Sequence, residues 1–320
     1  MAVINIDDAY ILGETGAQVD KVTGLFTKDE GTTSGEKSFA QLNIGTAGSN
    51  RNLLDNPWFT VNQRGFTSGT SGYISDRWTI LGGTPTITAL SPYGISVATS
   101  SAYNFIQNCW FTEADIDGRT LTLSANIDGE IQSVTFTAAV NSYYSFNFNN
   151  RLDMFRIFTG SSATAHPQVR FTHNTGSATH NYTVYATKLE PGSVSTLAND
   201  APPDYGEELA KCQRYFVRLM VANASIKTPI AFGFENAPTQ CRFKLTTPVP
   251  LRTTPTPSTS GTFYLDGISG EHQVTSFASA AAVYLTTDGI VWAANSTELT
   301  AGAYILSSIN GGYIDLSADL

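Results

Sequence analysis

The chain has 320 residues, which is enough for about two ordinary domains. Only 14% of the residues are charged, so neutral hydroxyl and amide groups must solvate much of the surface, and the apolar content of 41% disfavours intrinsic disorder. The formal net charge is −9 and Lys and Arg form no cluster along the chain, which argues against a nucleic-acid partner because phosphate binding needs cations.

Residues 1–50 contain few aromatics and only short apolar clusters. Val19, Val22 and Phe26 have i, i+3, i+7 spacing, which predicts one short amphipathic helix. The apolar surface is too small for an independent core, so we expect an attachment arm that packs on sister chains or on a larger particle. The alternative is a flexible tail. The expected contact residues are Val19, Val22, Leu25 and Phe26.

The segment from Met1 to Asp8 has neither the basic stretch nor the apolar stretch of a secretory signal. No apolar run approaches the roughly 20 residues that are needed to cross a bilayer. We therefore expect no membrane insertion, and release from the cell by lysis rather than by secretion.

Short strands are predicted between Asn52 and about Asn199. Residues 120–127 alternate apolar and polar side chains, as a half-buried strand should, and so do residues 133–137, 144–148 and 182–185. Tight turns are expected at Asp117-Gly118 and Asp128-Gly129. Strands at this spacing without intervening helices indicate an antiparallel β-sandwich.

Large apolar and charged residues alternate near the start of this region. Trp58, Phe59 and Trp78 are suited to core packing. Two arginines are expected to pair with nearby aspartates and to clip the entry strand to a loop. The four residues are Arg64, Arg77, Asp55 and Asp76.

One helix is predicted over residues 204–219, after a Pro-Pro pair. Asp204 can cap its first amides, and Glu207 stands in the capping-box position. Glu207 and Lys211 form an i, i+4 pair. The helix should carry one apolar stripe, formed by Leu209, Cys212, Phe216 and Leu219.

Strands resume from Val221 to Leu320, and we expect a second β-sandwich of about 100 residues. Candidate strands lie at residues 243–246, 261–265, 282–285, 290–292 and 312–316. Turns are expected at Asp266-Gly267, Asp288-Gly289 and Asn310-Gly311. A bend or sheet edge is expected at the prolines Pro248, Pro250, Pro255 and Pro257.

The sequence contains no Gly-x-Ser-x-Gly, His-Glu-x-x-His or phosphate-loop motif, and we expect no enzyme. Its three cysteines are widely spaced and odd in number, which predicts buried free thiols in a chain that folds in a reducing cytoplasm. These are Cys109, Cys212 and Cys241.

Two groups of polar residues are weak candidates for a metal site. Glu113, Asp115 and Asp117 have i, i+2, i+4 spacing and would share one strand face, where they could bind Ca²⁺, act as catalytic carboxylates, or form a solvated acidic turn. The three histidines that repeat every seven residues could meet their own copies in a trimer and hold a metal, or lie in surface loops. They are His166, His173 and His180.

Sugar binding needs an aromatic face for stacking, with amides or hydroxyls nearby. Four aromatic residues fit this local description, and each of them could instead be a core residue: Trp110, Tyr143, Tyr144 and Trp292. Tyr143 and Tyr144 should face opposite sides of one strand, so one is expected in the core and the other on the surface.

Several segments together resemble tailed-bacteriophage tail-fibre and receptor-binding proteins that have a carbohydrate-binding-like jelly-roll and a small β-tip domain. The resemblance covers about residues 50–320, and its motifs lie at residues 52–59, 63–65, 76–78, 189–192, 203–209, 212–216, 248–255 and 312–320. It implies a jelly-roll (51–200), a linking helix (201–220) and a C-terminal β-tip (221–320), which follow the attachment arm (1–50) that the composition predicts.

The resemblance also implies a homotrimeric structural protein of the virion that adheres to host-surface polysaccharide and contacts other virion proteins through residues 1–50. Residues 1–50 themselves do not match a fibre base, so tail and capsid locations both stay open. A purely architectural role and an envelope-polysaccharide depolymerase are the alternatives.

Overall fold

The computed structural model describes residues 17–19, 26–28, 51–99, 102–148, 152–158, 165–173, 180–219, 226–268, 270–278, 284–297 and 299–319. The structure is mainly β, with antiparallel sheets and few helices, which confirms the predicted fold class. The chain forms two compact units: residues 1–50 with 196–201, and residues 51–195 with 202–320. None of the described helices has the length and apolar character needed to cross a bilayer.

In the first unit, strands β1 (Ala17–Val19) and β2 (Phe26–Lys28) pair antiparallel, with Val19 opposite Phe26. The helix predicted from the spacing of Val19, Val22 and Phe26 is therefore wrong. Three apolar residues are too few to distinguish a helical period from two short strands of β-favouring side chains. Val22 and Leu25 lie outside the described residues. The same unit contains the 3₁₀-helix η1 (Leu197–Asn199).

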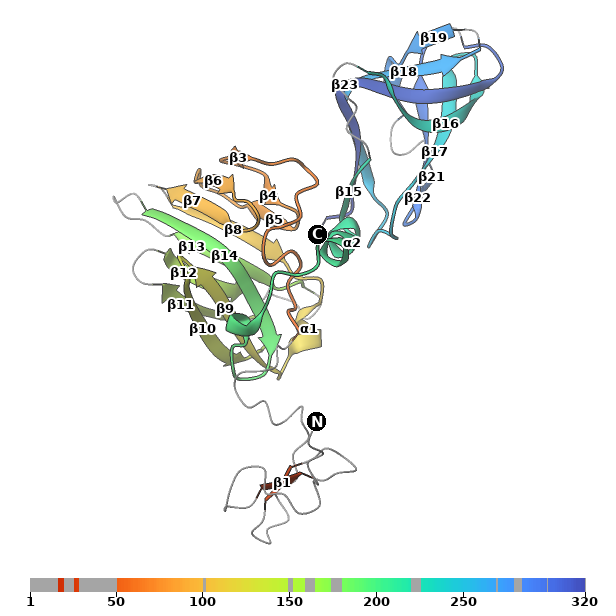
Figure 1. The fold of residues 1–320 in the computed structure, drawn as a ribbon. Coiled ribbons are helices and arrows are strands. Elements are labelled where there is room, and N and C mark those ends of the chain that lie inside the picture. Colours follow the sequence, from red (N-terminus) through yellow and green to blue (C-terminus); the bar gives the residue numbers. More distant parts are fainter. Residues whose placement is uncertain are drawn as a thin grey trace, which may run out of the picture. The chain divides into compact units, whose positions relative to one another are not determined.

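The second unit begins with a β-sandwich, which we call the first β-module (Figure 1). One six-stranded sheet has the order β10 (Glu130–Thr137), β9 (Thr120–Ile127), β14 (His180–Pro191), β7 (Ile95–Thr99), β6 (Thr86–Ala89) and β3 (Ser68–Gly69). The other has the order β11 (Tyr143–Phe148), β12 (Leu152–Phe158), β13 (Gln168–His173), β8 (Tyr103–Asn108), β5 (Trp78–Ile80) and β4 (Tyr73–Ser75).

The best-predicted element of this module is the hairpin of β9 and β10. Strand β9 covers residues 120–127 as expected, and β10 pairs with it from Glu130 to Thr137. Asp128 and Gly129 have φ values of 54° and 88°. Positive φ at both central residues is what a tight hairpin turn requires, and it explains why an Asp-Gly dipeptide stands here.

The core between the two sheets is built around Trp78, which is fully buried. Phe59, Phe105 and Phe171 contact its indole ring with centroid distances of 5.2, 6.0 and 6.0 Å. Trp58 and Phe59 are also buried, so the core role that was predicted for all three residues is confirmed.

Helix α2 (Tyr205–Gln213) follows the sandwich. The Asp204 carboxylate accepts a hydrogen bond from the Glu207 amide at 3.0 Å, which confirms the predicted cap. Lys211 pairs with Glu208 at 2.9 Å, whereas a pair with Glu207 was predicted. The helix is also shorter than expected, since residues 216–219 form a strand.

That strand, β15 (Phe216–Leu219), pairs with β23 (Ala303–Ser317). It belongs to the C-terminal β-module, in which one antiparallel sheet has the order β19 (Gly270–Gln273), β18 (Thr256–Gly267), β23, β16 (Thr228–Ala237), β17 (Gln240–Thr246), β22 (Gly289–Asn295) and β20 (Ser276–Phe277), with β21 (Tyr284–Thr286) beside β22. The two ends of this path, β19 and β20, are only two residues apart in the chain, so the sheet has to curl round (Figure 1). A single curled sheet thus replaces the predicted second sandwich.

The dipeptide Asn310-Gly311 was predicted to be a turn between strands but lies inside β23. Gly311 has a φ of 73°, and the register of β18 on β23 shifts between Ser260 and Thr262. A side chain on Gly261 would collide with Gly312, so the two strands bend together where glycines face each other.

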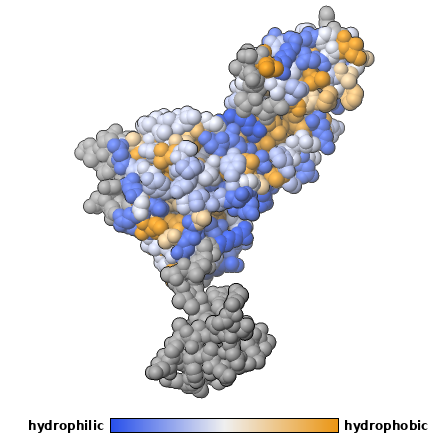
Figure 2. All heavy atoms as spheres, viewed as in Figure 1, coloured by the Kyte–Doolittle hydropathy of each residue, from blue (hydrophilic) through white to orange (hydrophobic). Residues whose placement is uncertain are grey.

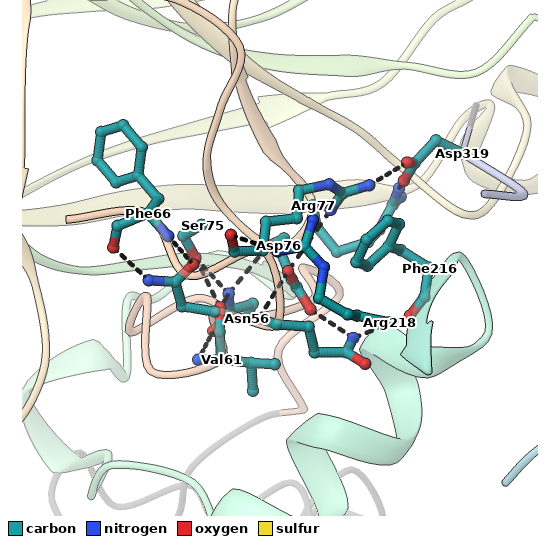
Figure 3. A network of polar contacts seen from close by, with 12 residues as sticks. Asn56, Val61, Phe66, Ser75, Asp76, Arg77, Phe216, Arg218 and Asp319 are labelled. Atoms are coloured by element: carbon teal, nitrogen blue, oxygen red, sulfur yellow. Dashed lines mark hydrogen bonds and ion pairs between the residues drawn. The ribbon is translucent and has the colours of Figure 1, made fainter. Parts of the chain in front are cut away.

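A buried polar cluster connects the first β-module to β15 and the C-terminus (Figure 3). We call it the junction; its central residue is Arg64, whose guanidinium lies between the rings of Tyr73 and Phe216, at 3.7 and 3.5 Å. Arg64 pairs with Asp76 at 3.5 Å and with Asp319 at 2.5 Å.

The amide of Gln63 donates to the Asp76 carboxylate at 2.5 Å and to the Phe216 carbonyl at 2.8 Å, and the guanidinium of Arg218 donates to the Arg64 carbonyl at 2.8 Å. The predicted pairing of Arg64 and Arg77 with nearby aspartates is confirmed, since Arg77 lies 3.2 Å from Asp55. Its extension to the C-terminus was not predicted.

Burial raises the pKa of Asp76 from 3.8 to about 6, against the opposing effect of the Gln63 hydrogen bonds and the Arg64 charge. The carboxyl group of Asp76 therefore binds its proton more tightly in the folded state than in the unfolded state. Asp76 contributes full stability below about pH 4, and this contribution is lost as the pH rises through about 6. It amounts to at most about 3 kcal/mol.

We expect Asp76→Asn to flatten the fall in the free energy of unfolding between pH 4 and pH 7. Urea unfolding followed by tryptophan fluorescence at several pH values measures this. Asp117→Asn, at an exposed carboxylate, is the matched control and should keep the wild-type slope. An unchanged slope in Asp76→Asn would contradict the assignment.

Candidate functional site

Trp110 is held at the surface of the first β-module, between the end of β8 and helix α1 (Glu113–Ile116). Its side chain is 42% exposed. The indole Nε1 donates to the Leu53 carbonyl at 3.0 Å, and the ring packs edge-on against Phe111 at 5.3 Å. Because the N–H group is already bonded and one edge is packed, the ring is fixed while part of it stays open to solvent.

A pocket of about 290 Å³ opens beside this ring. Its walls are mostly apolar, and its charged groups are Asp115 and Arg119. The apolar lining residues are Leu53, Trp110, Phe111, Ile116, Leu121 and Pro191. A rigid aromatic face with a few polar groups at one side is the arrangement that binds the C–H face and hydroxyls of a pyranose ring.

Asp115 is oriented by the start of α1. Its carboxylate accepts hydrogen bonds from the Thr112 amide and hydroxyl, both at 2.8 Å. These bonds hold the pKa of Asp115 below its usual value, and the positive charge of Arg119 acts in the same direction. The pocket therefore presents one fixed carboxylate and one cation at neutral pH.

The three clustered carboxylates do not share a strand face, so that prediction is wrong. Residues 113–116 form a helical turn, because Thr112 and Asp115 make a capping box. Glu113 is 1% exposed and accepts from the Asn141 amide at 2.9 Å, whereas Asp115 and Asp117 are exposed. Across the described part of the chain, no three His, Cys, Asp or Glu side chains are placed to hold a metal ion.

The two neighbouring tyrosines of β11 face opposite sides, as predicted. Tyr144 stacks on Phe136 at 4.1 Å, and its hydroxyl donates to the Thr137 carbonyl at 2.6 Å. Tyr143 is 63% exposed. Tyr144 is thus a packing residue, and Tyr143 remains a surface candidate that does not line the Trp110 pocket.

Trp292 cannot act as the predicted stacking surface. It is 4% exposed, stacks against Phe277 at 4.6 Å, and donates from Nε1 to the Ala278 carbonyl at 2.9 Å. It lies on the inner face of β22, where the curled sheet encloses its core. Trp292 is a core residue of the C-terminal β-module.

The remaining sequence candidates have structural roles where the structure describes them. His166 contacts the Phe111 carbonyl through Nδ1 at 2.9 Å, while the side chains of His173 and His180 lie outside the described residues. The three cysteines are buried free thiols, as predicted. Burial raises the pKa of all three thiols, that of Cys241 to about 11.

The structure therefore brings together Trp110 and Asp115, which the sequence had suggested for different purposes, and adds Arg119, which it had not suggested. The pattern Thr112-x-x-Asp115 is a readable capping signal that would have placed Asp115 beside the tryptophan. In comparisons with known proteins, the sequence matches no protein-family model and no curated protein.

Proposed function

We propose that this protein is a structural, non-enzymatic appendage of a bacteriophage virion, a tail fibre or tip, that attaches to host-surface glycan. The observation that carries the glycan-binding part is the fixed, exposed indole of Trp110 over a pocket with one carboxylate and one cation. The resemblance of residues 50–320 to phage fibre proteins supports the virion location, with residues 1–50 as the part that contacts other virion proteins.

Glycan hydrolysis is the function that the same pocket supports less well. A glycosidase needs two carboxylates on either side of the scissile bond. Here the side chain of Asp115 is engaged by Thr112, and Glu113 is buried beneath the surface. A binding role requires no second carboxylate, and it fits the apolar wall. An architectural role without glycan binding does not explain why the indole of Trp110 is both fixed and exposed.

The proposal includes a homotrimer. Phe232 and Phe234 of β16 are 75% and 70% exposed, at i, i+2 positions on one face of the sheet. Figure 2 shows apolar residues gathered on the visible face of the C-terminal β-module. Large apolar side chains that lie exposed beside each other are typical of interaction surfaces. Contact with sister chains would cover them. Three weak sugar sites on one particle would then act together.

We expect Trp110→Ala to weaken glycan binding at least tenfold, about 1.4 kcal/mol, because the stacking face is lost. Trp110→Phe should keep most of the affinity, since an aromatic face remains. A glycan array of bacterial surface polysaccharides, followed by calorimetric titration of the full chain with the best binder, measures both. Tyr205→Ala, at a side chain that is 55% exposed and does not line the pocket, is the matched control and should leave the affinity unchanged.

Glycan binding that survives Trp110→Ala in a folded protein would rule out this pocket. Binding to no polysaccharide would contradict the adhesion proposal as a whole. Release of reducing sugars from a bound polysaccharide would instead favour the depolymerase.

We expect the double variant Phe232→Ser/Phe234→Ser to lower the mass of the particle in solution. A trimer of the 34.3-kDa chain has three times that mass, about 103 kDa, and light scattering resolves it from a monomer. Tyr284→Ser, at a side chain that is 72% exposed on β21, is the control and should leave the mass unchanged. A monomeric wild-type chain would refute the trimer.

A further inference from the structure

A second cavity, of about 520 Å³, lies beside the C-terminal end of α2. Three of its lining residues are cations: Lys211, Arg214 and Arg252. The others are apolar, namely Ala210, Val249, Pro250 and Leu251, and its described lining contains no acidic residue. We call it the cationic cavity. In a chain of net charge −9, three cationic residues around one hollow are a local exception.

Two of the three cations have structural partners. Lys211 pairs with the buried Glu208 at 2.9 Å, and Arg252 lies 3.0 Å from Nε2 of His166 through Nη2. The guanidinium of Arg214 is exposed and has no hydrogen bond or ion pair within the described residues. The helix end accounts for some positive charge here, because its last carbonyls favour cations. It does not account for a cavity of this size with an apolar floor.

His166 lies between a lining residue of the cationic cavity and a wall residue of the Trp110 pocket. His166 contacts Arg252 through Nε2 and the Phe111 carbonyl through Nδ1. Since a guanidinium can only donate, Nε2 must accept and Nδ1 must carry the proton. Phe111 is itself a wall of the Trp110 pocket. His166 thus contacts one lining residue of each hollow, a side chain in the cationic cavity and a backbone carbonyl at the Trp110 pocket.

We propose that the cationic cavity is a subsite for the carboxylate of an acidic sugar, so that the ligand of this protein is an anionic polysaccharide. This inference rests on the proposed function. The guanidinium groups of Arg214 and Arg252, which form no ion pair among the described residues, select for negative charge, and Val249 and Pro250 offer an apolar surface to a sugar ring. An acidic peptide would meet the same charges, but the apolar residues of the lining fit the C–H face of a pyranose ring, and under the proposed function the ligand is a glycan.

The test compares three acidic oligosaccharides, oligogalacturonate, oligosialate and hyaluronan fragments, with their carboxyl-reduced neutral forms, in titrations of the full chain. We expect at least one acidic form to bind at least tenfold more tightly than its reduced form, with a preference that falls as salt is added. Arg214→Ala should remove most of that preference and leave the affinity for the reduced form unchanged. Lys244→Ala, an equal charge change at an exposed position of β17, should have no effect.

The outcomes separate the two proposals. If Trp110→Ala weakens binding but the acidic and reduced forms bind equally, the anionic subsite is refuted and the glycan adhesin stands. If none of these glycans binds while another polysaccharide of the array does, the anionic subsite is refuted and the glycan adhesin stands; if no polysaccharide binds at all, both are refuted. Binding of poly-L-glutamate that depends on Arg214, without binding of any acidic glycan, would assign the cavity to a peptide and overturn this inference. An unchanged melting temperature of Arg214→Ala shows that a lost preference is not a folding defect.

Discussion

The junction around Arg64 is the constraint on which the rest of the second unit depends. Buried ions are costly unless they are paired, and removing one partner leaves an uncompensated charge. Arg64 meets this condition with carboxylates from two distant parts of the chain, Asp76 and Asp319, and with an aromatic ring on each face. The C-terminal end of the chain is therefore needed to complete the charge balance of the first β-module.

The same network reaches the Trp110 pocket through Arg77. Its guanidinium pairs with Asp55 and donates to the Asn108 carbonyl at 2.5 Å, at the end of β8 and two residues before Trp110. Its other face lies 3.5 Å from the ring of Tyr215. The segment that accepts the indole N–H and the segment that carries the indole are thus fixed by one buried cation, so the position of the aromatic face follows from the junction.

A structural feature could be predicted from the sequence when residues a few positions away determine it. Strand β9 and the Asp204 cap are set by neighbours within a few residues, and both were predicted. Leu219 was assigned to the helix because its spacing is helical, but its pairing with β23, almost 100 residues away, decides its structure. The sequence left Trp292 open between a stacking surface and a core residue, because its exposure depends on the curl of the sheet. The strand assigned to Asp115 was wrong for a different reason, since the capping signal at Thr112, three residues earlier, favours a helical turn.

The cationic cavity likewise could not be predicted from a local sequence pattern. Its cations come from α2 and from the proline-rich segment about 40 residues later, so no cluster appears along the chain. Salt screens charges beyond about one Debye length, roughly 8–10 Å, so the cations of the cavity attract an anionic polysaccharide only at short range, and the net charge of −9 provides no steering toward it. Under the proposed function, a single contact therefore forms without electrostatic steering. Several copies on one particle would convert such contacts into firm attachment, because the first bound site holds the others at high local concentration.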